Sequence, residues 1–452
     1  MSTHRAQNQN QPLKRLGLAL LLTFAATSGA QAQSLQELYD AARAFDASYL
    51  SAVALADSAQ YKAAQADALG RPSVGLGMTG TLQRSDVPSG LSVNSDLLQA
   101  GLTARYAVFN RSNAVTISQA QRSLSVAKTD LEVAEQDLIV RVSQAYFDVL
   151  AAKDALATTQ ASKAAIAEQL ASAKRNFEVG TATITDTREA QARFDLASAG
   201  EIGADNDLRI KGVTLDQLVG RVGVLPKPLA VPVALPAVMP VNLEPWVSQA
   251  DDQHPLIRKA RLGLEVAQLE TSKARAAEGV TVDLTGTLGA QHLQNNLSGQ
   301  AATTLGVGTT KNASLGIALN YPLYTGGATQ NRIKETLALE EKARNDVDFA
   351  RRSVSEGTRR AFFGVQSLTA QVKALEAAES SSQLALDATQ LGYKVGVRVN
   401  LDVLNSQTQL FTTQRDLAKA RYDVVLNGLK LRQASGQLSP SDVSAVNMLL
   451  AK

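Results

Sequence analysis

The sequence contains two uninterrupted helical patterns of unusual length, and these limit what the chain can fold into. One runs from Asn113 to Phe177 and the other from Ala328 to Tyr393, and neither contains a proline. At a rise of about 1.5 Å per residue, about 65 helical residues form a rod of about 100 Å. An ordinary globular domain does not accommodate such a helix, so the sequence predicts an elongated molecule.

Each long pattern ends in a short turn with a central glycine. The first turn is Val179-Gly180-Thr181 and the second is Val395-Gly396-Val397. A return helix is expected after each turn, over residues 185–218 and 400–434. The turns and the acids that follow them repeat at one constant spacing, which indicates an internal duplication.

Two segments change from the helical period to alternation of every second residue. They are residues 73–109 and 280–324, and in the first of them Val74, Leu76 and Met78 alternate with small or polar residues. The pattern predicts two hairpins with strands of about ten residues, the length of a transmembrane β-strand. A half-buried soluble hairpin shows the same alternation, so this pattern alone leaves both possibilities open.

Four strands are too few to close a membrane barrel, since bacterial barrels have at least about eight. An open four-stranded sheet in a membrane would leave unpaired edges. If the strands are membranous, the barrel must therefore be shared between chains, and three copies would supply twelve strands. In that case the expected fold class is mixed α/β, in which each chain contributes four strands to a trimeric membrane barrel that continues into a long α-helical tunnel.

The N-terminus has the pattern of a signal peptide. Lys14 and Arg15 precede an apolar run from Leu16 to Ala26, and Ala30-Gln31-Ala32 is a cleavage motif. We expect cleavage after Ala32. A membrane anchor is the less favoured interpretation because the run is shorter than the roughly 20 residues that span a bilayer.

The remaining chain divides into two repeats and a connector. Residues 33–223 form the first repeat, 224–245 a proline-rich extended connector, 246–438 the second repeat and 439–452 a C-terminal tail. Removal of residues 1–32 removes three basic residues and no acids, which leaves equal numbers of each sign. No basic stripe argues for nucleic acid.

The sequence offers no catalytic constellation. It has no cysteine, and its three histidines are far apart. His254 before Pro255 is interpreted as a helix-start residue, and Trp246 as a packing residue. We therefore expect no enzyme activity, no catalytic residues, no cofactor and no metal.

The order of elements, the duplication, both Val-Gly turns and the segment Tyr321-Pro322-Leu323-Tyr324-Thr325-Gly326-Gly327 resemble the TolC family of outer-membrane factors. The resemblance covers essentially the whole chain after the signal peptide. It implies a homotrimer in the outer membrane with a periplasmic tunnel. Such a channel serves as a passive exit duct for proteins or small molecules in type I secretion or multidrug efflux. The expected partners are a periplasmic adaptor, an ABC- or RND-type inner-membrane pump and outer-membrane lipid. The alternative is a periplasmic coiled-coil scaffold or adaptor without channel activity.

The resemblance also implies a periplasmic gate at the turns, formed by Tyr393 and Arg398 with Thr185 and Asp186. Asp402 would form a selectivity ring in the pore, and Asn405 stands where a second acid would be. An alternative is purely local, because Arg398 and Asp402 are four residues apart and could pair on one helix.

Two further sets of residues are assigned, the first from the resemblance and the second from its place at the ends of the strands. The adaptor is expected to dock on the exposed turns, at Val179, Gly180, Thr181, Val395, Gly396 and Val397. An aromatic belt at the membrane interface is expected at Tyr106, Phe109, Tyr321 and Tyr324, although these aromatics could equally pack in an ordinary core.

Overall fold

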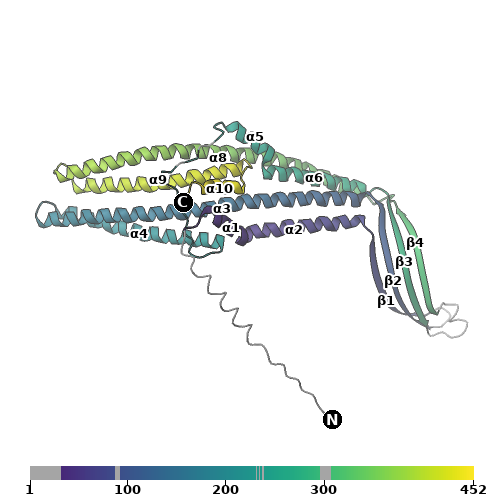
Figure 1. The fold of residues 1–452 in the computed structure, drawn as a ribbon. Coiled ribbons are helices and arrows are strands. Elements are labelled where there is room, and N and C mark those ends of the chain that lie inside the picture. Colours follow the sequence, from purple (N-terminus) through teal and green to yellow (C-terminus); the bar gives the residue numbers. More distant parts are fainter. Residues whose placement is uncertain are drawn as a thin grey trace, which may run out of the picture.

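The computed structural model describes residues 32–86, 92–230, 232–233, 235–236, 239–295 and 307–451. The expected signal peptide lies outside this range, apart from Ala32. The molecule is a long bundle of helices with a β-sheet at one end, and the two interhelical turns lie at the opposite end (Figure 1). The same order of helices and strands occurs twice along the chain.

The first copy contains two short helices, a hairpin, a long helix and a return helix. Its elements are α1 (Leu35–Phe45), α2 (Ala47–Asp67), a 3-10 turn η1 (Ala68–Gly70), β1 (Ser73–Asp86), β2 (Ser92–Asn110), α3 (Arg111–Glu178) and α4 (Ile184–Val219). The second copy contains α5 (Leu243–Gln253), α6 (Pro255–Ala276), β3 (Thr281–Asn295), β4 (Gly308–Asn320), α8 (Ala328–Lys394) and α9 (Asn400–Ala434). A final helix, α10 (Pro440–Asn447), follows. Within the residues described, no helix combines the length and the apolarity needed to cross a membrane.

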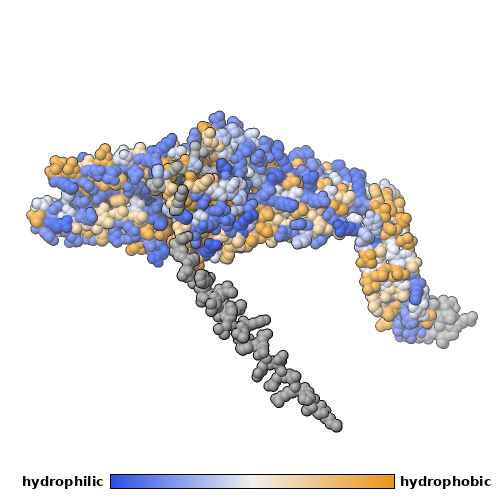
Figure 2. Space-filling model, viewed as in Figure 1, coloured by the Kyte–Doolittle hydropathy of each residue, from blue (hydrophilic) through white to orange (hydrophobic). Residues whose placement is uncertain are grey.

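The four strands form one antiparallel sheet in the order β1-β2-β3-β4. Val74, Leu76 and Met78 share one face, and each is at least 70% exposed in the single chain. Their register neighbours across the sheet, such as Leu102 and Leu288, continue this apolar face. Figure 2 shows apolar surface gathered over the sheet, whereas much of the helical bundle surface is hydrophilic. The predicted hairpins are present, with strands longer than the expected ten residues.

The main core lies in the middle of the helical bundle. Tyr39 from α1, Tyr146 and Phe147 from α3, Leu215 from α4 and Tyr422 from α9 are all buried there. Tyr422 donates a hydrogen bond from its hydroxyl to Asp154 (2.6 Å), and Tyr146 donates to the backbone carbonyl of Lys227 (2.7 Å). This core ties the two copies together far from both the sheet and the turns.

Three details of the sequence interpretation are corrected. The helical pattern that the sequence shows from Ser34 to Leu69 is divided into two helices, because Asp46 ends α1 and caps α2 through its side chain. Residues 243–245 are not extended connector but the first turn of α5, where a proline is tolerated because the first backbone N–H groups need no helical partner. The expected tail contains α10, and its Val443 and Val446 are buried in the main core.

Candidate functional site

The two turns that join the long helices to their return helices have the same backbone conformation. Gly180 has φ of 76° and Gly396 has φ of 79°, a region that strongly favours glycine. The amide of Gly180 donates to the carbonyl of Phe177 (3.0 Å), and the amide of Gly396 donates to that of Tyr393 (3.1 Å). We call these segments, residues 176–186 and 392–402, the first tip and the second tip.

Two polar side chains of the first tip, Thr183 and Asp186, are satisfied within it. Thr183 and Asp186 form a reciprocal capping box at the start of α4, with the Thr183 amide donating to Asp186 (2.9 Å) and the Asp186 amide donating to Thr183 (3.2 Å). Thr185 lies on the exposed surface of the same turn. The carboxylate of Asp186 therefore has a structural role in its own hairpin.

The second tip lacks such a cap. Val399 occupies the N-cap position of α9 and makes no side-chain hydrogen bond, so Asp402 is not held there. Asp402 pairs instead with Arg398, at 3.6 Å between Oδ2 and Nη1, and both side chains are substantially exposed. Arg398 folds back over Gly392, where an added Cβ would lie 2.8 Å from its Cγ. Any larger residue at position 392 would displace the arginine.

Three contacts join the two tip regions within one chain. Asn176 donates from Nδ2 to the hydroxyl of Tyr393 (3.0 Å). Arg193 of α4 donates from Nη2 to Oδ1 of Asn405 (3.1 Å). Leu404 is 1% exposed and packs in a cluster with residues of α3 and α4. The second return helix α9 is thus bound to the first hairpin.

Among the described residues, neither Tyr393 nor Arg398 is hydrogen-bonded or ion-paired to Asp186. The local Arg398–Asp402 pair that the sequence allowed is present. A contact from the second tip to Asp186 would therefore have to form between neighbouring chains, and the gate assignment stays a prediction. Sequence reasoning missed Asn176 and Arg193. Asn176 stands at the repeat position of Gly392, so this departure between the copies was a usable signal.

Both tips expose apolar side chains. Val179, Val395 and Val397 are between 66% and 75% exposed. At the opposite end of the bundle, Tyr106, Phe109, Tyr321 and Tyr324 all lie exposed where the strands meet the helices. In the single chain these aromatics are not core residues. Their assignment to a membrane interface stays a prediction.

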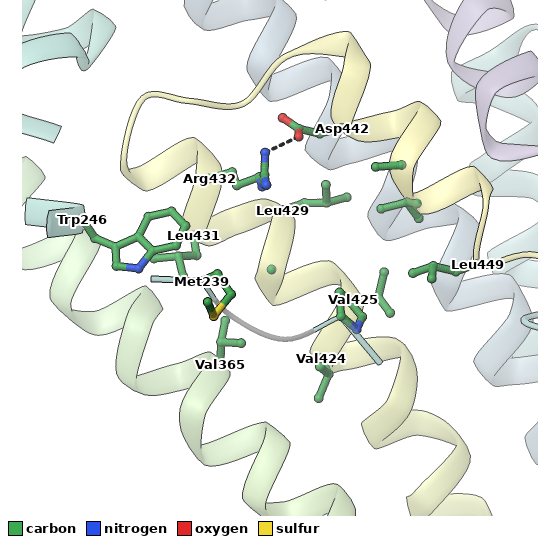
Figure 3. A pocket seen from close by; sticks show the side chains of 14 residues that line it. Met239, Trp246, Val365, Val424, Val425, Leu429, Leu431, Arg432, Asp442 and Leu449 are labelled. Carbon is green, nitrogen blue, oxygen red and sulfur yellow. Dashed lines mark hydrogen bonds and ion pairs between the residues drawn. The ribbon is translucent and has the colours of Figure 1, made fainter. Parts of the chain in front are cut away.

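A largely apolar pocket lies in the middle of the bundle beside the connector. Trp246 of α5, Val365 of α8 and Leu431 of α9 line it, with an Arg432–Asp442 ion pair at one end (Figure 3). Trp246 is buried and donates from its indole N–H to the carbonyl of Pro240 (2.9 Å), which agrees with the predicted packing role. The lining carries no pairing of nucleophile and base.

His254 is the N-cap of α6, as the sequence predicted. Its Nδ1 accepts a hydrogen bond from the amide of Leu256 (3.1 Å). Burial lowers the pKa of the imidazole, because the charged form loses hydration. Over the described residues, no group of three or more His, Cys, Asp or Glu side chains could hold a metal ion.

The model of the family described as outer membrane efflux protein matches residues 38–221 and 246–437. The outer membrane protein TolC of Vibrio cholerae is 32% identical over 423 residues, which are 93% of this chain and 94% of that protein. The chain belongs to the outer membrane efflux protein family. The two matched segments cover both tips and all four strands.

Other similarities agree with this membership. The alkaline protease secretion protein AprF of Pseudomonas aeruginosa is 31% identical over 69% of this chain and 64% of its own length. Among solved structures, the Campylobacter jejuni CmeC outer membrane channel has a TM-score of 0.78 at 16% identity, over 92% of this chain and 90% of that one. The outer membrane protein VceC of Vibrio cholerae has a TM-score of 0.75 at 20% identity, over 89% and 96%.

The predicted resemblance, the fold class of the chain and the outer-membrane location are confirmed by these comparisons. This efflux-family protein is an outer-membrane protein, and its family and structural neighbours are channels and transport proteins rather than enzymes.

Proposed function

We propose that three copies of this chain form a passive exit duct for proteins or small molecules. The observation that carries the proposal is the sheet: it has one strongly apolar face, and β1 and β4 are left at its edges. Unpaired strand edges are not tolerated in lipid, so an outer-membrane sheet of four strands has to be completed by further copies. Three copies give a twelve-stranded barrel, with the helical bundles continuing it as a periplasmic tunnel.

The tips would form the periplasmic entrance of this duct. In the proposed trimer, Tyr393 and Arg398 of one chain face Thr185 and Asp186 of the next, and these contacts keep the entrance closed. Asp402 would form an acidic ring near the constriction. Asn405 replaces a second acid and accepts a hydrogen bond from Arg193, so this ring position carries no negative charge.

The tips would also receive the partners. The exposed valines at Val179, Val395 and Val397 offer an apolar surface to a periplasmic adaptor, which would couple the duct to an inner-membrane pump. The naming of AprF as a protease secretion protein supports a protein cargo as one class, and the efflux family supports small molecules as another.

Single-channel recording in planar bilayers tests the proposal. The purified wild-type protein should give a small conductance at rest. The double variant Tyr393→Phe, Arg398→Ser should have a conductance several times larger, because both hydrogen-bond donors of the proposed gate are lost. Val397→Thr serves as the matched control, because it alters an exposed side chain at the same tip without removing a donor. Unchanged conductance in the double variant would defeat the gate assignment, and a protein without any conductance that fractionates as a soluble monomer would support the scaffold alternative.

Substitutions at the Asn176–Tyr393 hydrogen bond distinguish a closed entrance held by contacts within one chain from one held by contacts between chains. If this bond alone held the entrance, Asn176→Ala would open the channel as much as Tyr393→Phe. If Tyr393 also bonds a neighbouring chain, Tyr393→Phe should open it further, and the two substitutions combined should match Tyr393→Phe alone.

A further inference from the structure

The polar face of the sheet is almost free of charge. Register places Ser73, Arg105, Thr285 and Gly316 on this face, opposite the apolar one. Glycine, serine, threonine, asparagine and glutamine dominate it, and a shallow hollow lies on it, lined in part by Gly77, Gln99, Gly101, Thr287 and Asn312. Among the described strand residues on this face, Arg105 of β2 and Asp283 of β3 are the charged ones.

These two residues pair with each other. The Nη2 atom of Arg105 donates to Oδ2 of Asp283 at 2.7 Å. In the regular register Asp283 lies opposite Ala107, so its pair with Arg105 crosses the ladder diagonally, just before the register shift between Ala107 and Phe109. The pair lies at the end of the sheet where β1 and β3 begin and β2 passes into α3.

The two partners are unequally exposed. The Arg105 side chain is 64% exposed, whereas the Asp283 side chain is 16% exposed. One guanidinium nitrogen is bound to the carboxylate, and a guanidinium has further N–H donors in a planar fork that suits carboxylates and phosphates. A solute moving along this face therefore meets the arginine before the aspartate.

We propose that Arg105 and Asp283 form a charge-selective ring at the neck between barrel and tunnel, and that Arg105 attracts anionic groups of the exported solutes. This inference rests on the proposed trimeric duct, in which the apolar face contacts lipid and the polar face lines the lumen. Threefold symmetry turns the pair into three guanidinium groups around the neck, each held from behind by one carboxylate. The charge exposed at the neck is thus positive, whereas the charge of the acidic residues at the tips is negative.

Holding the sheet together does not require this pair. The backbone ladder between β2 and β3 runs without a break from Ser95 to Ala107, and it resumes at Phe109 after one register shift. An ion pair with a solvent-exposed arginine contributes little to stability, because water competes for the charges. A charged pair that stands alone among small neutral residues of the lumen face is better explained by an effect on the charged solutes that pass through the lumen.

The test is the reversal potential of the channel in a KCl gradient, measured in the Tyr393→Phe, Arg398→Ser background so that the entrance does not dominate the current. Arg105→Gln leaves three unpaired carboxylates and should raise the potassium-to-chloride permeability ratio by about twofold or more. Asp283→Asn leaves three unpaired guanidinium groups and should lower the ratio. Both shifts should grow as ionic strength falls, because screening weakens.

The controls separate charge from structure. Arg105→Lys keeps the charge and should keep the parental ratio. Arg84→Gln removes an equally exposed arginine that pairs with Asp86 on the other face of the same sheet, and it should leave the ratio unchanged. If Asp283→Asn does not assemble, Arg105→Gln against Arg105→Lys still decides the question.

The outcomes also separate this inference from the proposed function. A conducting parent whose permeability ratio is the same in Arg105→Gln and Arg105→Lys overturns the ring and leaves the duct intact. A shift of the same sign in Arg105→Gln and Asp283→Asn likewise overturns the ring. Absence of conductance in the parent and every variant overturns the duct, and the ring with it.

Discussion

The two tips have one backbone and two different sets of side-chain partners. In both, the amide of the residue after the turn glycine closes onto the helix: Thr181 donates to the carbonyl of Asn176 (2.8 Å), and Val397 donates to that of Gly392 (2.9 Å). Thr183 and Asp186 then cap the first return helix, whereas Val399 leaves the second uncapped. The fold needs only the glycine turn, and the side chains around it are free to differ.

The two return helices differ in how many of their residues are buried. α4 has Ala190, Leu215 and Val219 as its buried residues, whereas α9 buries residues along its whole length. At the start of α9, Asn400 is buried and neither of its side-chain amide atoms has a partner among the described residues. The second return helix thus packs more extensively than the first, in clusters with residues of α3, α4 and α8.

The largest expected effect comes from removing the packing that the second hairpin depends on. Leu404→Ala should lower the local free energy of opening at the start of α9 by about 2–5 kcal/mol, because a fully buried leucine is lost from an apolar cluster. Native-state hydrogen exchange of amides 400–410 measures this. At the matching position of the first hairpin, Arg188→Ala should change the free energy of opening by no more than about 0.5 kcal/mol. Equal effects at both positions would contradict the asymmetry.

A smaller effect should follow when the second tip is given the cap of the first. Val399 is extended, with φ of −98° and ψ of 160°, and Asp402 lies three residues on. Val399→Thr should therefore create a capping box and draw Asp402 away from Arg398. The free energy of opening in the first turn of α9 should rise by about 1 kcal/mol, which slows hydrogen exchange there. Thr183→Ala should cost the first hairpin a similar amount. Faster exchange in Val399→Thr would show that Asp402 cannot leave its arginine.

Most of the fold could be predicted because its signals are local. The absence of proline over α3 and α8, the Val-Gly turns and the alternation in the strands are all visible within short windows of sequence. The end of the chain was also readable, since Ser439 and Asp442 form a capping box with Pro440 at the first helical position. The sequence predicts only a tail here, because a helix of eight residues shows little periodicity beside the long helical patterns.

The contacts between hairpins could not be predicted in the same way. Which residue meets Tyr393 depends on how far α3 and α8 are shifted along each other, and one residue of shift changes the partner. Repetition shows that Gly180 and Gly396 are equivalent, but not that Asn176 of one copy would bind Tyr393 of the other. The pair of Arg105 and Asp283 has the same origin, since strand register decides it.

The N-cap residues of α2 and α6 differ in the pH range over which they titrate. Asp46 and His254 are the equivalent N-caps of the two copies. Two hydrogen bonds from Arg141 (2.9 Å each) hold the pKa of the Asp46 carboxyl below its usual range, against the opposing effect of burial. Burial lowers the pKa of His254. Both groups have a lowered folded pKa, so each contribution is complete above the unfolded pKa and declines as pH falls through the folded one.

The smallest expected effect is a difference in acid sensitivity between these caps. The unfolded pKa is about 6.5 for histidine and about 3.9 for aspartate, so mild acid should loosen α6 and leave α2 unchanged. Hydrogen exchange at pH 5.5 and 7.5, corrected for intrinsic rates, should show faster opening at residues 256–262 but not at 48–54. His254→Asn keeps a side-chain acceptor at the cap without a titrating group, and it should abolish the difference. If α2 and α6 respond alike in the wild type, or if His254→Asn retains the response, the two caps do not set the acid sensitivity of their copies.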